Sequence, residues 1–180
     1  MVNKTLVPNK WVAISGSWAI TSKDVENDVR HNVRDILKNS GGIVTGGALN
    51  VDSFATDEVI KFNPECKYIK IFLPTTLKIY SAHYKKRAKE GVITLKQAED
   101  LIAQLEYVKR VNPKAIIENK TNKIVDKKTY FERNMEVVKA ADELYAFHVI
   151  ESTGGGTQDT IEKAKKLGLK VKRFDYKVTK

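Results

Sequence analysis

The sequence has little cysteine and no long apolar run. Cys66 is the only cysteine among 180 residues, so the chain can form neither an intramolecular disulfide nor a cysteine-based zinc site, and a reducing cytoplasm is the simplest compartment. No segment approaches the roughly 18 consecutive apolar residues that a membrane span needs, and residues 1–10 hold no apolar stretch of signal-peptide length. We therefore expect a soluble, cytoplasmic protein that does not contact membranes.

Glycine and proline are also sparse. Ten glycines and four prolines accompany 42% hydrophobic and 30% charged residues, which is typical of a globular chain and not of a disordered or fibrous one. The length of 180 residues suits a single core, and the sequence contains no internal repeat or low-complexity tract. We expect one domain over residues 1–180.

Acidic residues are in the minority: 22 Asp and Glu oppose 32 Lys and Arg, giving a formal charge of +10. A surplus of this size attracts polyanions. Many of the cations, as in 85–89 and 163–166, occupy positions where an amphipathic helix meets solvent, and no aromatic series lies between them. Weak, salt-dependent nucleic-acid binding through the basic surface is therefore the most that the charge predicts.

Short apolar runs alternate with segments of helical periodicity. Because strand and helix alternate, the pattern predicts an α/β fold of Rossmann-like type, with a mainly parallel sheet flanked by helices on both faces. Residues 77–125 form a helical insertion with uncertain boundaries, and 115–128 has the polar character of a connecting loop. The predicted strands are 11–17, 43–45, 68–73, 143–150 and 170–176, and the predicted helices outside the insertion are 22–39, 50–62, 129–141 and 157–167.

Small and polar residues follow three of these strands, in 15–17, 45–48 and 152–157. Glycines let backbone N–H groups approach a ligand, a following helix N-terminus favours an anion, and the carboxyl ends of parallel strands open on one edge. We therefore expect one phosphate-binding site there. Its candidate residues are Ser15, Gly16, Ser17, Gly46, Gly47, Gly154, Gly155, Gly156 and Thr157.

The loops lack the common sequence fingerprints of nucleotide-binding enzymes. None of them is a G-x-G-x-x-G fingerprint or a Walker lysine loop, so neither bound NAD nor ATP hydrolysis is indicated. His31 and His83 have no neighbours that suggest a metal site or a catalytic triad. We expect no cofactor and no metal.

Three charged residues are candidates for the same site. Arg133 could make a bidentate contact to phosphate, or it could pair with Glu132 or Glu136 on its own helix. Asp52 could accept a hydrogen bond from a ribose hydroxyl, or it could hold a loop. Asp159 could complement the dipole of the last helix, or it could be catalytic.

Five segments form an ordered set of motifs along the chain: Ile14-Ser15-Gly16-Ser17, Thr45-Gly46-Gly47-Ala48-Leu49-Asn50-Val51-Asp52, Glu132-Arg133-Asn134, Ala141-Asp142 and Ser152-Thr153-Gly154-Gly155-Gly156-Thr157. This set resembles the SLOG superfamily, which joins the DprA/Smf DNA-processing proteins and the LOG phosphoribohydrolases. The resemblance extends over about residues 11–174 but leaves 77–125 unmatched, and it implies a Rossmann-like fold and, by analogy with these families, a homo-oligomer.

The two branches of the superfamily imply different chemistry. LOG enzymes cleave the N-glycosidic bond of nucleoside 5'-monophosphates with an Arg, which Arg133 matches, and a Glu, whose position is Thr160 here. Thr153 replaces the proline of the LOG glycine motif. The pattern through Asp52 is closer to the DprA-like branch, although Trp18 stands where those proteins usually have Arg.

The leading interpretation is a protein that binds a nucleotide-like, phosphate-bearing small molecule. The first alternative is an N-glycosidic hydrolase in which Asp159 or Glu132 replaces the missing Glu. The second is DprA-like binding of single-stranded DNA.

Overall fold

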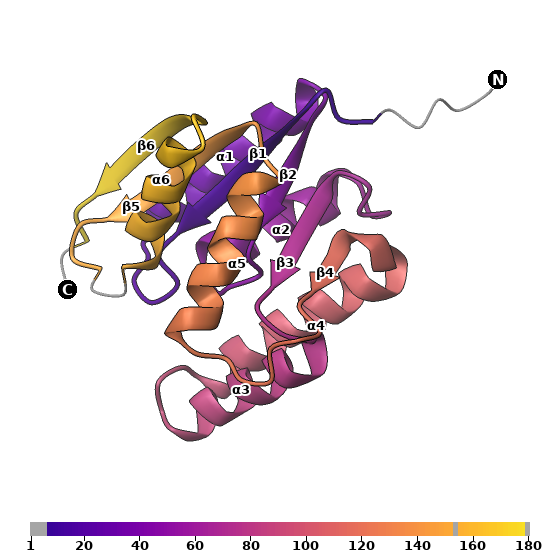
Figure 1. Ribbon diagram of the computed structural model, residues 1–180, viewed down its shortest axis with the longest axis vertical. Helices are drawn as coiled ribbons and strands as arrows, with labels where there is room; N and C mark the ends of the chain where they lie inside the picture. The colour runs from indigo at the N-terminus through magenta and orange to yellow at the C-terminus, as the bar shows by residue number, and fades with distance from the viewer. Residues whose placement is uncertain (1–6, 153–154, 179–180) are drawn as a thin grey trace.

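The computed structural model describes residues 7–152 and 155–178, which form a six-stranded sheet in the order β4-β3-β2-β1-β5-β6. Every neighbouring pair of strands is parallel. The predicted α/β, Rossmann-like class is confirmed (Figure 1). The strands are β1 Lys10–Gly16, β2 Gly41–Thr45, β3 Ile69–Leu73, β4 Ile116–Glu118, β5 Glu143–Val149 and β6 Lys170–Tyr176.

Helices cover both faces of the sheet, with α5 and α6 on the near face in Figure 1 and α1 and α2 behind it. α3 and α4 pack at the β3–β4 end. The helices are α1 Lys23–Lys38, α2 Val51–Phe62, α3 Leu77–Lys89, α4 Leu95–Val111, α5 Lys127–Lys139 and α6 Gly156–Lys166, with a short 3₁₀ turn at Pro113–Ala115.

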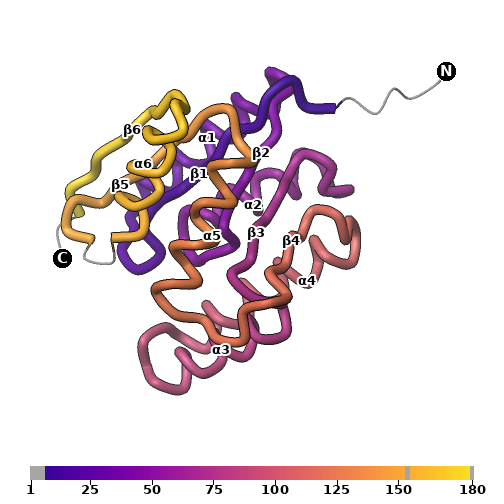
Figure 2. Tube along the Cα trace, viewed as in Figure 1, coloured from indigo at the N-terminus to yellow at the C-terminus, as the bar shows by residue number. Residues whose placement is uncertain are grey.

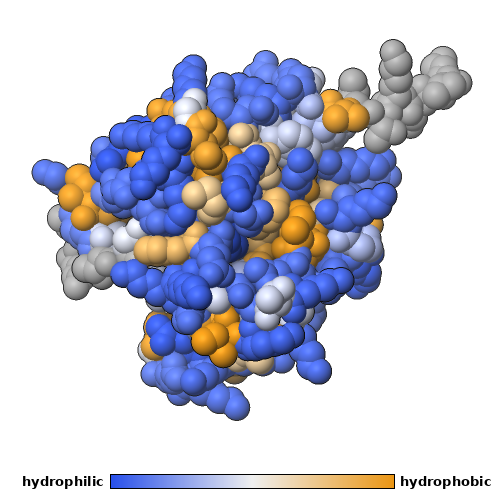
Figure 3. All heavy atoms as spheres, in the orientation of Figure 1, coloured by the Kyte–Doolittle hydropathy of each residue, from blue (hydrophilic) through white to orange (hydrophobic). Residues whose placement is uncertain are grey.

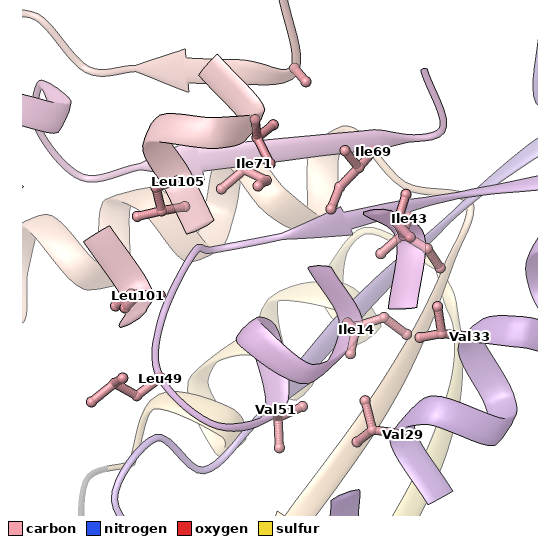
Figure 4. Close-up of a cluster of buried hydrophobic side chains, with 14 of the residues drawn as sticks. Ile14, Val29, Val33, Ile43, Leu49, Val51, Ile69, Ile71, Leu101 and Leu105 are labelled. Carbon is pink, nitrogen blue, oxygen red and sulfur yellow. The ribbon is translucent and has the colours of Figure 1, made fainter. Parts of the chain in front are cut away.

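Alternating side chains of the strands supply two hydrophobic cores, one on each face. On β1, Val12 and Ile14 point to the core shared with α1, α2 and α4, whereas Ala13 points to the core under α5 and α6. Figure 4 shows the larger core, where Ile14 and Ile43 of the sheet lie near Val29 of α1. Burying each such side chain stabilises the fold by roughly 1.5–3 kcal/mol, so these strands are fixed in register by their apolar faces.

Helix α1 illustrates how the sequence sets its boundaries. The Ser22 hydroxyl accepts a hydrogen bond from the Val25 N–H at 3.3 Å and so caps the first turn. Val25, Val29 and Val33 recur at helical spacing and are fully buried. The predicted helix over 22–39 therefore matches α1 together with its two capping residues.

The prediction of a connecting loop over 115–128 is wrong at both ends. Ile116–Glu118 forms β4, an edge strand that pairs with β3 through Ile71 and Ile116. Helix α5 begins at Lys127, two residues before the predicted start, because Asp126 and Thr129 form a capping box. A three-residue strand is too short for a period-two pattern, so its pairing depends on β3 and not on local sequence.

The surface over α5 and α6 is largely hydrophilic, with apolar areas between the charged side chains (Figure 3). In the last turn of α6, Lys165 and Lys166 are exposed, as their helical positions predict. Lys163 is an exception, because its side chain is only 17% exposed and pairs with Asp159. Across residues 7–152 and 155–178, none of the helices combines the length and apolarity required to cross a bilayer.

Candidate functional site

The loops that follow β1, β2 and β5 line one cavity of about 450 Å³ at the carboxyl edge of the sheet. In Figure 2 the loop after β1 and the starts of α5 and α6 lie on the same side of the molecule. The loops thus meet, as a parallel sheet requires. The residues of these segments in the cavity wall are Ser15 and Gly16 at the end of β1 and Ser17 after it, Gly46 and Ala48 after β2, and Ser152, Gly156 and Thr157 after β5.

Among the described residues, two of the candidate glycines, Gly47 and Gly155, are not part of that wall. Gly154 lies outside the described residues. Gly47, with a φ of 66°, packs against side chains of β3, and its carbonyl accepts a hydrogen bond from the Tyr80 hydroxyl. Gly155 has a φ of 69° and is the N-cap of α6. Gly47 and Gly155 therefore allow the backbone to turn, because a left-handed conformation favours glycine.

Asp52 holds the loop after β2. Its Oδ2 accepts hydrogen bonds from the N–H groups of Gly46 at 3.0 Å and Ala48 at 3.2 Å, and the side chain is buried in the cavity wall. Burial raises the pKa of Asp52, although the Arg133 charge and the two N–H donors oppose the shift. Of its two expected roles, loop support is the one that these contacts provide.

Arg133 reaches the same loop from α5. Its Nη1 donates to the Gly46 carbonyl and its Nε donates to Asn134 Oδ1 at 3.1 Å. Among the described residues it makes no ion pair with Glu132 or Glu136, and its Nη2 makes no hydrogen bond to the protein in the same part of the chain. The guanidinium is therefore fixed at the cavity wall with one nitrogen still able to donate.

The start of α6 faces the cavity, and no side chain of the described residues caps it. The first N–H groups of a helix have no partner within it, and here they join the positive end of the helix dipole. A Cβ on Gly156 would meet nothing within 4 Å among the described residues, and Gly156 has helical backbone geometry. The fold therefore gives no steric reason for glycine at this position.

The loop after β1 is held by its own contacts. Ser17 is buried, and its Oγ accepts a hydrogen bond from the Ile20 N–H at 3.0 Å, which leaves its hydroxyl proton available. A Cβ on Gly16 would lie 2.8 Å from the Phe147 carbonyl oxygen and would overlap Val51. Gly16 is thus required for close packing of β1 against β5 and α2.

Asp159, the candidate catalytic carboxylate, does not line the cavity. It accepts hydrogen bonds from Lys163 at 2.5 Å and from Asn134 Nδ2 at 3.0 Å. Thr160, at the position of the LOG glutamate, donates its hydroxyl to the Gly156 carbonyl at 2.9 Å. Both side chains therefore support the start of α6.

The other end of the cavity is aromatic and cationic, which the sequence patterns did not indicate. α3 contributes His83, Tyr84 and Arg87, and α5 contributes Tyr130 and Phe131. A signal was present, because Arg87 lies four residues after His83 and three after Tyr84, and these spacings make side chains neighbours on a helix. Residues from separate segments thus bring aromatic rings and cations together, although no single stretch of sequence has this pattern.

Comparisons with known proteins establish the fold. No protein-family model matches the sequence, and no curated protein is significantly similar to it. Among solved structures, DNA processing protein A from Helicobacter pylori has a TM-score of 0.67 and 18% identity over 99% of this chain and 71% of that one. The Helicobacter pylori protein binds single-stranded DNA.

Two further solved structures share the architecture. DprA from Streptococcus pneumoniae has a TM-score of 0.58 and 18% identity over 93% of this chain, which spans about half (51%) of that protein. The protein TM1055 has a TM-score of 0.51 and 15% identity over 90% of this chain and 72% of that one. The chain has the Rossmann-like fold of these three proteins, two of which are DprA proteins.

Proposed function

We propose that the cavity binds a nucleotide or nucleotide-derived ligand through its phosphate group. The observation that carries the proposal is the start of α6, which no side chain of the described residues caps and which faces a cavity that Arg133 also lines. Backbone N–H groups, the helix dipole and a guanidinium all favour an anion. The volume of about 450 Å³ falls within the usual range for small-molecule sites.

Several polar groups of the wall have hydrogen-bonding capacity that the protein does not use. Among the described residues, the hydroxyls of Ser15, Ser152 and Thr157 donate no hydrogen bond to the protein, and neither does Arg133 Nη2. Each of these groups can donate to a phosphate oxygen. The open space at Gly156 lets such an oxygen approach the backbone.

Calorimetric titration with AMP, adenosine and inorganic phosphate tests the proposal. Thr157→Val removes one donor while keeping the shape of the side chain, and losing a hydrogen bond to a charged group costs about 1.5–3 kcal/mol, or roughly 10- to 150-fold in affinity. The matched control is Thr21→Val, because the Thr21 hydroxyl is buried without a partner among the described residues and lies outside the cavity wall. Equal affinity of the wild type for AMP and adenosine would refute a phosphate site.

Binding of single-stranded DNA is the second candidate. Arg87 and Lys127 line the cavity beside aromatic rings, and a cationic groove with aromatic faces is the general means of holding single strands. The Helicobacter pylori protein of similar fold binds single-stranded DNA. Fluorescence anisotropy with a labelled single-stranded oligonucleotide tests this candidate. If DNA binds in the cavity, Lys127→Ala should lower the affinity for the oligonucleotide.

A further inference from the structure

We propose that α3 and the first turns of α5 form a base-binding end of the cavity, so that the ligand carries an aromatic base as well as a phosphate. This inference rests on the proposed phosphate site. It adds which part of the ligand the rest of the cavity recognises, where His83, Tyr84 and Tyr130 form the wall.

The cavity wall has two chemically different parts. The loops after β1, β2 and β5 present hydroxyls, backbone N–H groups and the single ring of Trp18, whereas most of the rings come from α3 and the start of α5. The His83 ring lies 5.8 Å from that of Tyr84 and 6.3 Å from that of Tyr130, centroid to centroid, in edge-to-face arrangements, and the Arg133 guanidinium lies 5.4 Å from the Tyr130 centroid. A ligand that consisted only of a phosphorylated sugar would leave these rings without a partner, whereas a planar base can contact them.

The rings are fixed in place before any ligand binds. Behind them, the buried Tyr80 packs edge-to-face on Tyr84 at 5.0 Å and shares a hydrogen bond of 3.3 Å with the Tyr84 hydroxyl. The Tyr80 hydroxyl also donates to the Gly47 carbonyl at 3.2 Å. The aromatic end is therefore tied directly to the glycine loop after β2.

The protonation state of His83 suits a neutral base. Burial lowers the pKa of His83, and the positive charge of Arg87 lowers it further; Glu90 opposes this shift, and Lys86 adds a smaller lowering effect. The imidazole is thus uncharged at neutral pH and offers one donor and one acceptor nitrogen. Uncharged bases present the same mixture of donors and acceptors on their edges.

Comparing the affinities of the wild type for AMP and for ribose 5-phosphate, which lacks the base, measures what the base-binding end contributes. Stacking of a base on aromatic side chains predicts that AMP binds roughly 5- to 150-fold more tightly. His83→Ala should bring the affinity for AMP close to that for ribose 5-phosphate and leave the latter unchanged. Tyr130→Leu should act in the same direction, whereas Tyr130→Phe, which keeps the ring, should not.

His31→Ala is the matched control, because His31 is an exposed histidine of α1 outside the cavity wall. If the wild type binds AMP and ribose 5-phosphate equally well, the base-binding end is refuted and the phosphate site stands. If neither compound binds, the phosphate site fails and the base-binding end fails with it. A loss of affinity for both compounds on His83→Ala would indicate a general disturbance and would also refute the inference.

Discussion

Replacing Gly156 by alanine separates the needs of the fold from those of a ligand. The position is helical, and an added methyl group meets no protein atom within 4 Å among the described residues. Replacing glycine at such a position stabilises a protein by about 0.4–1 kcal/mol, chiefly because the unfolded chain loses freedom. For a domain of this size, about 1 kcal/mol corresponds to a rise of roughly 2–4 °C in Tm.

Ligand binding should change in the opposite direction. The methyl group of Gly156→Ala would project into the cavity at the first turn of α6, where the proposal places a phosphate oxygen against backbone N–H groups. Displacing that oxygen removes at least one charge-assisted hydrogen bond, worth about 1.5–3 kcal/mol. Affinity for AMP should therefore fall roughly 10- to 150-fold while stability stays level or rises.

Gly46→Ala supplies the contrasting case. A Cβ on Gly46 would overlap the Arg133 guanidinium, so Arg133 must leave its contacts with the Gly46 carbonyl and Asn134, and the buried Asp52 loses a neighbouring positive charge. We expect a destabilisation of about 2–4 kcal/mol, since hydrogen bonds to charged groups contribute about 1.5–3 kcal/mol each. Urea denaturation and calorimetric titration of both variants provide the measurements. Unchanged AMP affinity in the stable Gly156→Ala variant would refute the placement of the phosphate.

Three further predictions concern charge. Burial raises the pKa of Asp52 in the folded state. The contribution of Asp52 to the unfolding free energy is therefore complete below the pKa of the unfolded chain and is lost as pH rises through the folded pKa. In urea titrations, Asp52→Asn should flatten the decline in unfolding free energy above about pH 4. Asp159→Asn should leave AMP affinity level or raise it, and chromatography should detect no free base from AMP with either protein; release by the wild type alone would establish the hydrolase. Affinity for a single-stranded oligonucleotide should fall steeply with salt in anisotropy titrations, whereas a tight, salt-resistant complex would place DNA binding first.

The order of strands and helices was predictable because most elements bury a regular face. In α1 the i, i+4 spacing of Val25, Val29 and Val33 was enough to predict the helix, and Ser22 marked its start. The common edge of the glycine loops followed from parallel pairing alone. These features depend on patterns within about one helix or strand of sequence.

Other features depend on contacts between distant segments and could not be predicted in the same way. β4 exists because Ile116 pairs with Ile71, a partner far away in the chain. Tyr80 and Tyr84 lie on one helical face, which predicts burial, but their spacing does not reveal that one ring supports the core while the other lines a cavity. The role of the α3–α4 segment therefore became visible only in three dimensions.

The carboxylates of the cavity wall bear on the choice between a binding protein and a hydrolase. Two of them, Asp52 and Asp126, line it. Asp126 caps α5, and the hydrogen bond from the Thr129 N–H lowers its pKa, so Asp126 is a poor proton donor. Asp52 has the raised pKa that a general acid needs, but its Oδ2 is committed to two backbone N–H groups. Of the two wall carboxylates, only Asp52 could therefore serve glycosidic chemistry, and it would do so through its Oδ1. In that case Asp52→Asn, which keeps an oxygen for the loop, would abolish base release and leave phosphate binding intact.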